Sequence, residues 1–160
     1  IDMEIEPFLI ASSIEMVIAQ RLVRRLCSTC ASPAGMDEGQ FLANLALLGV
    51  PADESVNSGK VLRSVGCQQC RNLGYRGRVG IFEIMPMSDA IHSLVIKNAA
   101  APDIRRVAIE EGMRSLQLSG WEQIKRGLTT FDEVIRYSDG FGTDNGDDHG
   151  DETLAVEQTV

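Results

Sequence analysis

The stretch Gly66-Cys67-Gln68-Gln69-Cys70-Arg71-Asn72-Leu73-Gly74 contains the second of two C-x-x-C pairs in this 160-residue chain. The first pair is Cys27-Ser28-Thr29-Cys30, and 36 residues separate the two. The sulfurs of a C-x-x-C pair converge on one point, so two pairs complete a tetrahedral site of four thiolates. Glycine on both sides of the second pair suits a tight turn that needs positive φ angles. The sequence therefore predicts one zinc site with the ligands Cys27, Cys30, Cys67 and Cys70.

Two other uses of four cysteines stay open at the level of the residues. A pair of disulfides needs an oxidising compartment, and no signal-peptide pattern is visible at this end of the chain. A thioredoxin-like redox pair needs one C-x-x-C and leaves the second without a role. The paired spacing favours zinc over both alternatives. Because four thiolates fill the coordination sphere, the metal is predicted to be structural and not catalytic.

Charge is distributed unevenly along the chain. Residues 139–160 contain seven acidic residues, four glycines and no Lys or Arg, and they lack apolar periodicity. Such a segment buries too little surface to offset its ordering entropy, so we expect a disordered acidic tail. The remaining 16 acidic and 15 basic residues nearly balance, which argues against a nucleic-acid groove. No run of about 18 apolar residues occurs, so no membrane span is predicted.

The segments that flank the cysteine pairs are prone to form strands. Apolar residues alternate from Ile14 onward and favour a strand over Glu15–Leu26, with a helix as the alternative. The apolar run Arg78–Met85 ends at Pro86 and favours a second strand. If the two strands pair antiparallel, the segment between them is an insertion at the tip of a β-hairpin. Zinc would then cross-link the two ends of a long loop that could not fold alone.

Helices are predicted inside the insertion and on both sides of the hairpin. Apolar residues at helical spacing predict a helix over Asp37–Leu48 that Gly49 ends, and Lys60–Val65 is expected to form a short strand. Further helices are expected to begin near Glu6-Pro7, Ser88, Pro102-Asp103, Leu116 and Thr130, the last with a capping box between Thr130 and Glu133.

No complete catalytic motif occurs in the sequence. Ser58-Gly59-Lys60 only superficially resembles a phosphate-binding loop, because Val61 stands where Ser or Thr is needed and Glu54 where Gly is needed. The G-x-S-x-G and H-E-x-x-H motifs are absent, and neither His92 nor His149 lies in a motif with a partner. We therefore predict no catalytic residues in this chain.

Several stretches closely resemble the type II secretion and type IV pilus assembly ATPases. The tetracysteine region of that family matches Ala19-Gln-Arg-Leu-Val-Arg-Arg-Leu-Cys27-Ser-Thr-Cys30, Gly66-Cys67-Gln-Gln-Cys70 and Gly74-Tyr-Arg-Gly-Arg-Val-Gly-Ile-Phe-Glu83. The segment before it matches Ile5-Glu-Pro-Phe-Leu-Ile-Ala-Ser-Ser13, and the C-terminal helices match Glu111-Gly-Met-Arg-Ser-Leu116 and Gly127-Leu-Thr-Thr-Phe-Asp-Glu-Val-Ile-Arg136. The resemblance runs from residue 1 to about residue 138, and the acidic tail lies outside it.

The resemblance implies the C-terminal part of a hexameric P-loop ATPase that serves protein secretion or pilus assembly at the cytoplasmic face of the bacterial inner membrane. ATP and Mg²⁺ are then cofactors of the whole protein, whose phosphate-binding motifs are expected before Ile1. This chain alone is expected to be inactive. The implied fold is α/β for the parent and α+β for this piece: the end of a P-loop core, a hairpin with an inserted zinc lobe, and a C-terminal helical bundle.

The expected organisation has five parts. Residues 1–26 end the ATPase core, 27–75 form the zinc lobe, 76–87 return to the core, 88–138 form a helical subdomain, and 139–160 form the acidic tail. The implied partners are identical subunits of a homo-hexamer and the inner-membrane platform proteins of the apparatus, with no nucleic acid. Arg21, Arg76 and Arg78 are candidate interface residues, because charged forks near a Gly-flanked loop suit contacts across subunits.

Two alternatives stay open. One is an independent zinc-ribbon interaction module, which only the cysteine pattern supports. The other is a stand-alone descendant of the ATPase that has lost its activity and only docks to the secretion or pilus apparatus. The sequence does not distinguish secretion from pilus assembly.

Overall fold

A computed structural model of the chain describes residues 6–51 and 58–137. The predicted acidic tail at 139–160 lies outside these ranges. Within them, the chain combines helices with two small antiparallel sheets, which confirms the α+β prediction for this piece. None of the described helices is long and apolar enough to cross a membrane.

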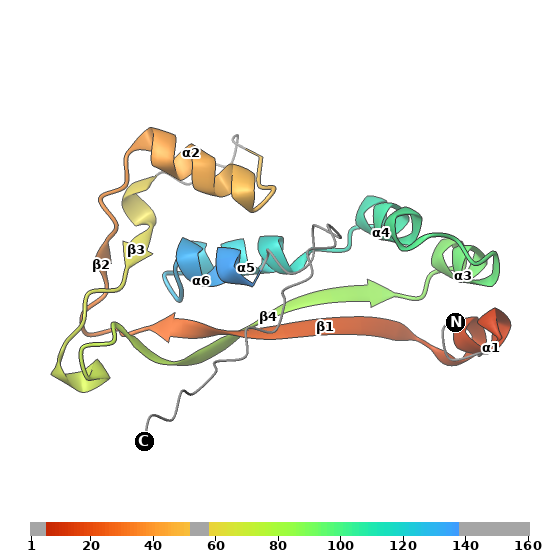
Figure 1. Ribbon diagram of the computed structural model, residues 1–160, viewed down its shortest axis with the longest axis horizontal. Coiled ribbons are helices and arrows are strands. Elements are labelled where there is room, and N and C mark those ends of the chain that lie inside the picture. Colours follow the sequence, from red (N-terminus) through yellow and green to blue (C-terminus); the bar gives the residue numbers. More distant parts are fainter. Residues whose placement is uncertain (1–5, 52–57, 138–160) are drawn as a thin grey trace, which may run out of the picture.

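A long two-stranded ribbon is the axis of the fold (Figure 1). Strand β1 (Met16–Leu26) pairs antiparallel with β4 (Tyr75–Pro86), with Met16 opposite Pro86 and Leu26 opposite Tyr75. The register shifts between Arg24 and Leu26, where β4 carries an extra residue. The predicted hairpin is therefore confirmed, and the helix considered for Glu15–Leu26 is wrong. Apolar residues that alternate from Ile14 through Met16 to Ile18 favour this outcome, because a strand places every second side chain on one face.

The two faces of the ribbon differ in what covers them. On one face, Val23 and Ile81 are buried against Leu116 of helix α5 (Leu116–Lys125), with Ala19 and Val79 packed around them. The opposite face leaves large apolar side chains between 42% and 54% exposed; they are Met16, Ile18, Leu22, Phe82 and Ile84. This second group is called the apolar ribbon face below.

Three short helices lie at the end of the ribbon where β1 begins and β4 ends (Figure 1). They are α1 (Pro7–Ser13), α3 (Asp89–Ile96) and α4 (Ala101–Glu110). Ser88 caps α3, as predicted, by accepting a hydrogen bond of 3.2 Å from the amide of Ile91. Ile91, Ala108 and Met113 form the buried centre of this end.

The segment between the strands turns back over the C-terminal helices (Figure 1). It contains β2 (Ser32–Pro33), α2 (Glu38–Leu47), a 3-10 turn at Ser58–Lys60, β3 (Leu62–Arg63) and a 3-10 turn at Gln68–Cys70. Asp37 caps α2 by accepting from the amide of Gln40 at 2.8 Å. The strand predicted over Lys60–Val65 is only two residues long, and it pairs with β2.

The largest core joins the insertion to helices α5 and α6 (Phe131–Arg136). Its centre is an aromatic group in which the ring centroids of Phe41 and Trp121 lie 6.1 Å apart and those of Trp121 and Phe131 lie 5.6 Å apart. Leu45, Leu48, Val50, Val61, Ile124 and Val134 complete it. Helix α2 is therefore held by the C-terminal helices independently of the cysteines.

Candidate metal centre

The four predicted ligands lie together at the end of the ribbon where the insertion leaves and returns. All four sulfur atoms are within 4.8 Å of one another. The Sγ atoms of Cys27 and Cys67 are 3.9 Å apart, and those of Cys30 and Cys70, and of Cys67 and Cys70, are each 3.8 Å apart. Zn–S bonds of about 2.3 Å in a tetrahedron require sulfurs about 3.8 Å apart. The cluster therefore fits a tetrathiolate metal site.

The ribbon and two short backbone turns place these sulfurs. The amide of Cys27, directly after β1, donates to the carbonyl of Gly74 at 3.0 Å, so both knuckles start from one pair of strands. Within each knuckle the second cysteine amide donates to the first cysteine carbonyl at 3.2 Å. Backbone amides also reach sulfur: that of Gly66 lies 3.3 Å from the Sγ of Cys30, and those of Cys67 and Gly74 each lie 3.2 Å from the Sγ of Cys70.

The two glycines predicted to flank the second pair are required by its geometry. Gly66 has φ +118° and Gly74 has φ +75°, in the region that L side chains rarely adopt. A Cβ on Gly74 would also lie 2.6 Å from the Cβ of Ser64, and one on Gly66 would lie 2.9 Å from the carbonyl oxygen of Asn72. Both positions therefore demand glycine for the turn and for the close approach of the backbone.

The protein environment shifts the pKa values of three of the cysteines, and not all in the same direction. Burial tends to raise the pKa of Cys70, but the amides of Cys67 and Gly74 and the neighbouring thiols outweigh it and lower that pKa to about 6. At Cys30 burial prevails over the amide of Gly66, and the pKa rises to about 11. A bonded amide at Thr29 is the largest influence that lowers the pKa of Cys27. Amides directed at sulfur are how a protein supports thiolate ligands.

All four cysteines are free thiols, and Cys27 and Cys70 are buried. The four sulfurs converge on one point, so a single metal site accounts for both C-x-x-C pairs. A single redox pair accounts for only one of them, and no disulfide is formed among these cysteines. The donor set is complete without any further ligand, so no open position is left for a substrate.

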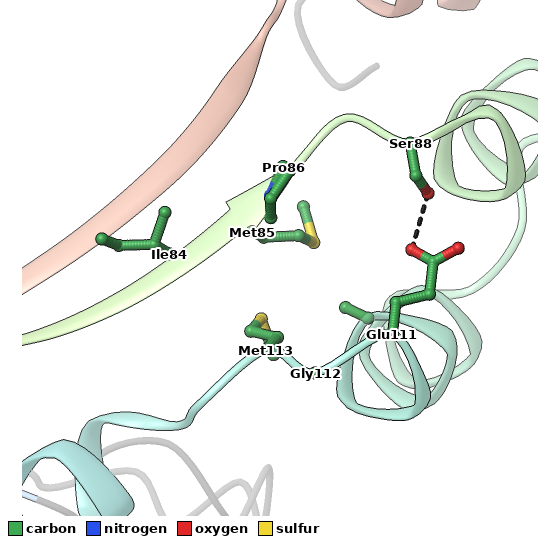
Figure 2. A pocket seen from close by; sticks show the side chains of 8 residues that line it. Ile84, Met85, Pro86, Ser88, Glu111, Gly112 and Met113 are labelled. Carbon is green, nitrogen blue, oxygen red and sulfur yellow. Dashed lines mark hydrogen bonds between the residues drawn. The ribbon is translucent and has the colours of Figure 1, made fainter.

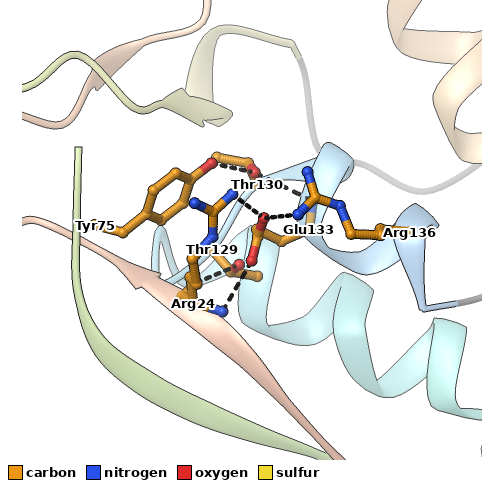
Figure 3. A network of polar contacts seen from close by, with 6 residues as sticks. All are labelled: Arg24, Tyr75, Thr129, Thr130, Glu133 and Arg136. Atoms are coloured by element: carbon orange, nitrogen blue, oxygen red, sulfur yellow. Dashed lines mark hydrogen bonds and ion pairs between the residues drawn. The ribbon is translucent and has the colours of Figure 1, made fainter. Parts of the chain in front are cut away.

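A network of polar contacts, which the sequence did not reveal, connects the cysteine end of β1 to α6 (Figure 3). The carboxylate of Glu133, only 1% exposed, accepts from the backbone amide of Arg24 at 3.0 Å and from its guanidinium at 2.5 Å. Thr129 donates to the carbonyl of Arg24 at 2.9 Å, and the hydroxyls of Tyr75 and Thr130 are 3.1 Å apart. The guanidinium of Arg24 also lies over the Tyr75 ring, 4.2 Å from its centroid.

This network corrects one expectation. Thr130 caps α6 by accepting from the amide of Glu133 at 3.4 Å, so half of the predicted capping box forms. The Glu133 side chain turns to Arg24 instead of to the helix end, because a buried carboxylate is better satisfied by a guanidinium and an amide. In the sequence, the only sign of this contact is a Glu at the third position of the helix. The local pattern interprets that residue as half of a capping box and does not point to Arg24.

The predicted interface arginines are all exposed on the ribbon. Arg21 lies in β1 and donates to the carbonyl of Gln20 at 3.1 Å. Arg76 and Arg78 lie in β4, and Arg78 is directly opposite Arg24.

A shallow pocket of about 320 Å³ lies between the end of β4 and helices α3 and α4 (Figure 2). Met85 and Met113 contribute side chains to its wall, and Ser88 donates to the carboxylate of Glu111 at 2.6 Å. This hydrogen bond joins the first residue before α3 to the residue that ends α4.

The chain resembles proteins of bacterial secretion and pilus machinery. A family model described as "Type II/IV secretion system protein" matches residues 1–136. The chain is 42% identical over 135 residues to the type IV pilus assembly ATPase PilB of Myxococcus xanthus, covering 84% of this chain and 23% of that protein. It is 40% identical over 136 residues to the type II secretion system protein E of Pseudomonas aeruginosa, covering 85% and 26%. The corresponding Aeromonas hydrophila protein is 38% identical over 135 residues, covering 84% and 25%.

The chain therefore belongs to the type II/IV secretion system protein family, whose matched members include ATPases of pilus assembly. The resemblance drawn from the sequence is confirmed. The chain spans about a quarter of the length of these relatives, between 23% and 26%.

Proposed function

We propose that this chain is the metal-binding C-terminal part of an ATPase that drives type II secretion or type IV pilus assembly. The observation that supports it is the joint match of residues 1–136 to the family and of four cysteine sulfurs to a tetrathiolate site. In this proposal, residues 27–75 are the metal lobe, residues 1–26 and 76–87 belong to the core of the motor, and residues 88–138 form the helical subdomain. The nucleotide chemistry belongs to the rest of the protein, with ATP and Mg²⁺ bound there.

The role proposed for the metal is structural zinc. Cys27, Cys30, Cys67 and Cys70 would hold it, and zinc would supply the bonds that keep the two knuckles together. Arg21, Arg76 and Arg78, which are exposed on the ribbon, would serve contacts with neighbouring subunits of a hexamer or with the inner-membrane platform.

The metal assignment is tested by expressing the 160-residue chain and measuring its metal content by mass spectrometry. We expect about one zinc per chain and none in a Cys67→Ser variant. Tetrahedral thiolate sites also accept iron, so a visible absorption band from iron would contradict the zinc assignment. A Ser28→Ala variant, changed between two ligands, is the matched control and should keep the metal.

The motor assignment is tested with a chimera in which residues 6–137 replace the matching segment of the M. xanthus pilus ATPase. We expect ATP turnover and hexamers close to those of the parent. The same chimera with Cys27→Ser and Cys67→Ser shows whether the metal lobe is needed for assembly. A chimera that folds and binds metal but neither hydrolyses ATP nor forms hexamers would contradict the proposal.

The alternative of an independent zinc-ribbon module gains nothing from the structure of the described residues. The ribbon, the metal lobe and the C-terminal helices share packing through two cores, one around Val23 and Ile81 and one around Trp121.

A further inference from the structure

Three buried polar side chains lie in one short segment at the start of α6. Thr129 is 0% exposed, Thr130 is 5% exposed and Glu133 is 1% exposed. Within residues 6–51 and 58–137, no other hydroxyl-bearing or charged residue is buried. Burial of such groups costs free energy unless each finds a hydrogen-bond partner, so their partners show what the segment holds.

The main partners of this segment are the last residues of β1. The carboxylate of Glu133 accepts from the amide of Arg24 at 3.0 Å, and the hydroxyl of Thr129 donates to the carbonyl of Arg24 at 2.9 Å. The amide of Leu26 donates to the carbonyl of Leu128 at 2.9 Å. These bonds hold β1 at its register shift, where its regular pairing with β4 is interrupted. We call the residues of the segment the C-terminal clamp: Leu128, Thr129, Thr130 and Glu133.

The C-terminal clamp also holds the first residue of β4. The hydroxyls of Tyr75 and Thr130 are 3.1 Å apart, and the guanidinium of Arg24 lies over the Tyr75 ring, 4.2 Å from its centroid. That guanidinium is itself bound to the carboxylate of Glu133 (Figure 3). The two strand ends nearest the cysteines are therefore bound to one segment of the C-terminal helices.

The residues held by the clamp are next in sequence to the two backbone positions that join the knuckles. Leu26 precedes Cys27, and Tyr75 follows Gly74. The amide of Cys27 donates to the carbonyl of Gly74 at 3.0 Å, and the amide of Gly74 lies 3.2 Å from the Sγ of Cys70. Because Cys27 belongs to the first pair and Cys70 to the second, the clamp fixes where the two knuckles start relative to each other.

Ligands that are held in place before the metal arrives bind it more tightly. The two cysteine pairs are separated by 36 residues, and bringing them together costs conformational entropy that metal binding must otherwise offset. Contacts made by the fold meet part of that cost in advance for Cys27 and Cys70. Groups that orient ligands without touching the metal typically change metal affinity by about 10- to 100-fold.

We propose that the C-terminal clamp positions the cysteine ligands, and that zinc affinity depends on Glu133 and Thr129. Both are positioning residues, because they reach the ligands only through Arg24, which is 109 residues from Glu133 in sequence. The inference rests on the proposed zinc site and adds that this site is coupled to α6. Coupling of this kind is reciprocal, so zinc in turn stabilises the bonds between the clamp and β1.

The test measures the zinc affinity of the full chain by competition with a chelator. We expect Glu133→Gln and Thr129→Val each to weaken zinc binding about tenfold, because each loosens the hold on Arg24 at nearly constant side-chain size. Thr129→Ser keeps the hydroxyl that donates to Arg24, so this variant should bind zinc as tightly as the natural chain.

Two control variants separate ligand positioning from general stability. Glu122→Gln makes the same chemical change at an ion pair with Lys125 near the surface. Ile91→Val removes a methylene group from the buried centre at the other end of the ribbon. It should lower the stability of the chain, because it leaves a small cavity, yet both controls should keep the natural zinc affinity.

A second measurement needs no substitution. The amides of Arg24 and Leu26 donate to the clamp, so their hydrogen exchange, followed by nuclear magnetic resonance, reports on these bonds. We expect both amides to exchange about tenfold faster once a chelator has removed zinc, by the same coupling factor as in the affinity measurement. The amides of α3, at the other end of the ribbon, should keep their exchange rates.

The possible failures are distinguishable. If the natural chain binds zinc and both Glu133→Gln and Thr129→Val bind it equally well, the positioning role is wrong and the metal centre stands. The positioning role is also wrong if Ile91→Val weakens zinc binding as much, or if zinc removal leaves the exchange of the Arg24 and Leu26 amides unchanged. A natural chain that binds no zinc overturns the metal centre and this inference together.

Discussion

Glu133 holds a charge where solvent is almost absent. Its carboxylate is 1% exposed and depends on Arg24, whose side chain is 46% exposed. A buried carboxylate that loses its partner is strongly destabilising, whereas a partner in contact with water costs less. The ion pair therefore contributes to stability mainly by satisfying the buried carboxylate of Glu133. It also fixes the position of β1 relative to α6.

We expect Glu133→Gln to lower the free energy of unfolding by about 2 kcal/mol, because the amide cannot accept a charge-assisted pair from Arg24. Urea unfolding of the metal-loaded chain measures this. Glu122→Gln, which removes an ion pair with Lys125 at the surface, is the control and should cost less than about 1 kcal/mol. An equal cost in both variants would contradict the special role of Glu133.

The same residue predicts a pH dependence. Burial tends to raise the pKa of Glu133, but the hydrogen bonds and charge of Arg24 outweigh burial and lower it below the ordinary 4.5. A group with a lowered pKa in the folded state stabilises the fold above its unfolded pKa and loses that contribution as pH falls through the folded value. The stability difference between the natural chain and Glu133→Gln should therefore be constant from pH 7 to 5.5 and shrink below about pH 4.5. A constant difference down to pH 3 would contradict this.

At the scale of elements, helices α5 and α6 meet through a glycine. A Cβ on Gly120 would overlap the side chain of Val134, which is itself fully buried in the largest core. Gly120 is therefore selected for close helix packing and not for helix propensity, which it lowers.

We predict that Gly120→Ala destabilises the chain by about 2 kcal/mol through overpacking. Val134→Ala in the same chain should restore part of the loss, with a coupling energy of about 1 kcal/mol. Thermal or urea unfolding of the two single variants and the double variant forms the cycle. Gly39→Ala, in α2, is the control and should change stability little. If the changes in unfolding free energy for Gly120→Ala and Val134→Ala were additive, the two side chains would not be in contact.

The strands and the clustering of the four cysteines could be predicted from the sequence because their signals are local. Alternation of apolar residues specifies β1, and the two C-x-x-C pairs with flanking glycines specify the knuckles. What could not be predicted depends on partners far away in the sequence. Glu133 and Arg24 are 109 residues apart, and the β2–β3 pair is two residues on each strand, too short for any periodic signal.

The packing of α2 was missed for the same reason. Its apolar face was visible in the spacing of Phe41 and Leu45, but a pattern does not say which element covers it. Trp121 and Phe131 do, since their side chains fill the space between α2 and the C-terminal helices.

At the scale of the molecule, the cysteine cluster and the aromatic core hold different parts of the insertion. The cysteines tie both of its ends to the ribbon, whereas Phe41 and Leu45 tie its middle to Trp121. Removal of the metal should therefore loosen the insertion unevenly.

We predict that a zinc chelator, or Cys67→Ser, raises protease sensitivity and amide exchange between residues 27 and 75, and most of all in the stretches 27–36 and 64–74. The amides of α2 should remain protected, because its core survives. Hydrogen exchange followed by mass spectrometry resolves these stretches. Unchanged proteolysis with zinc still bound in Cys67→Ser would contradict the ligand assignment.

The apolar ribbon face has a practical consequence for anyone who purifies this chain. Five large side chains between 42% and 54% exposed, aligned on one side of two strands, make a water-repelling strip. The chain alone should precipitate or stick to surfaces as its concentration rises, and Ile18→Lys with Phe82→Lys should extend its solubility. These two positions are far from the cysteines in the strand register, so the more soluble variant should keep its full metal content.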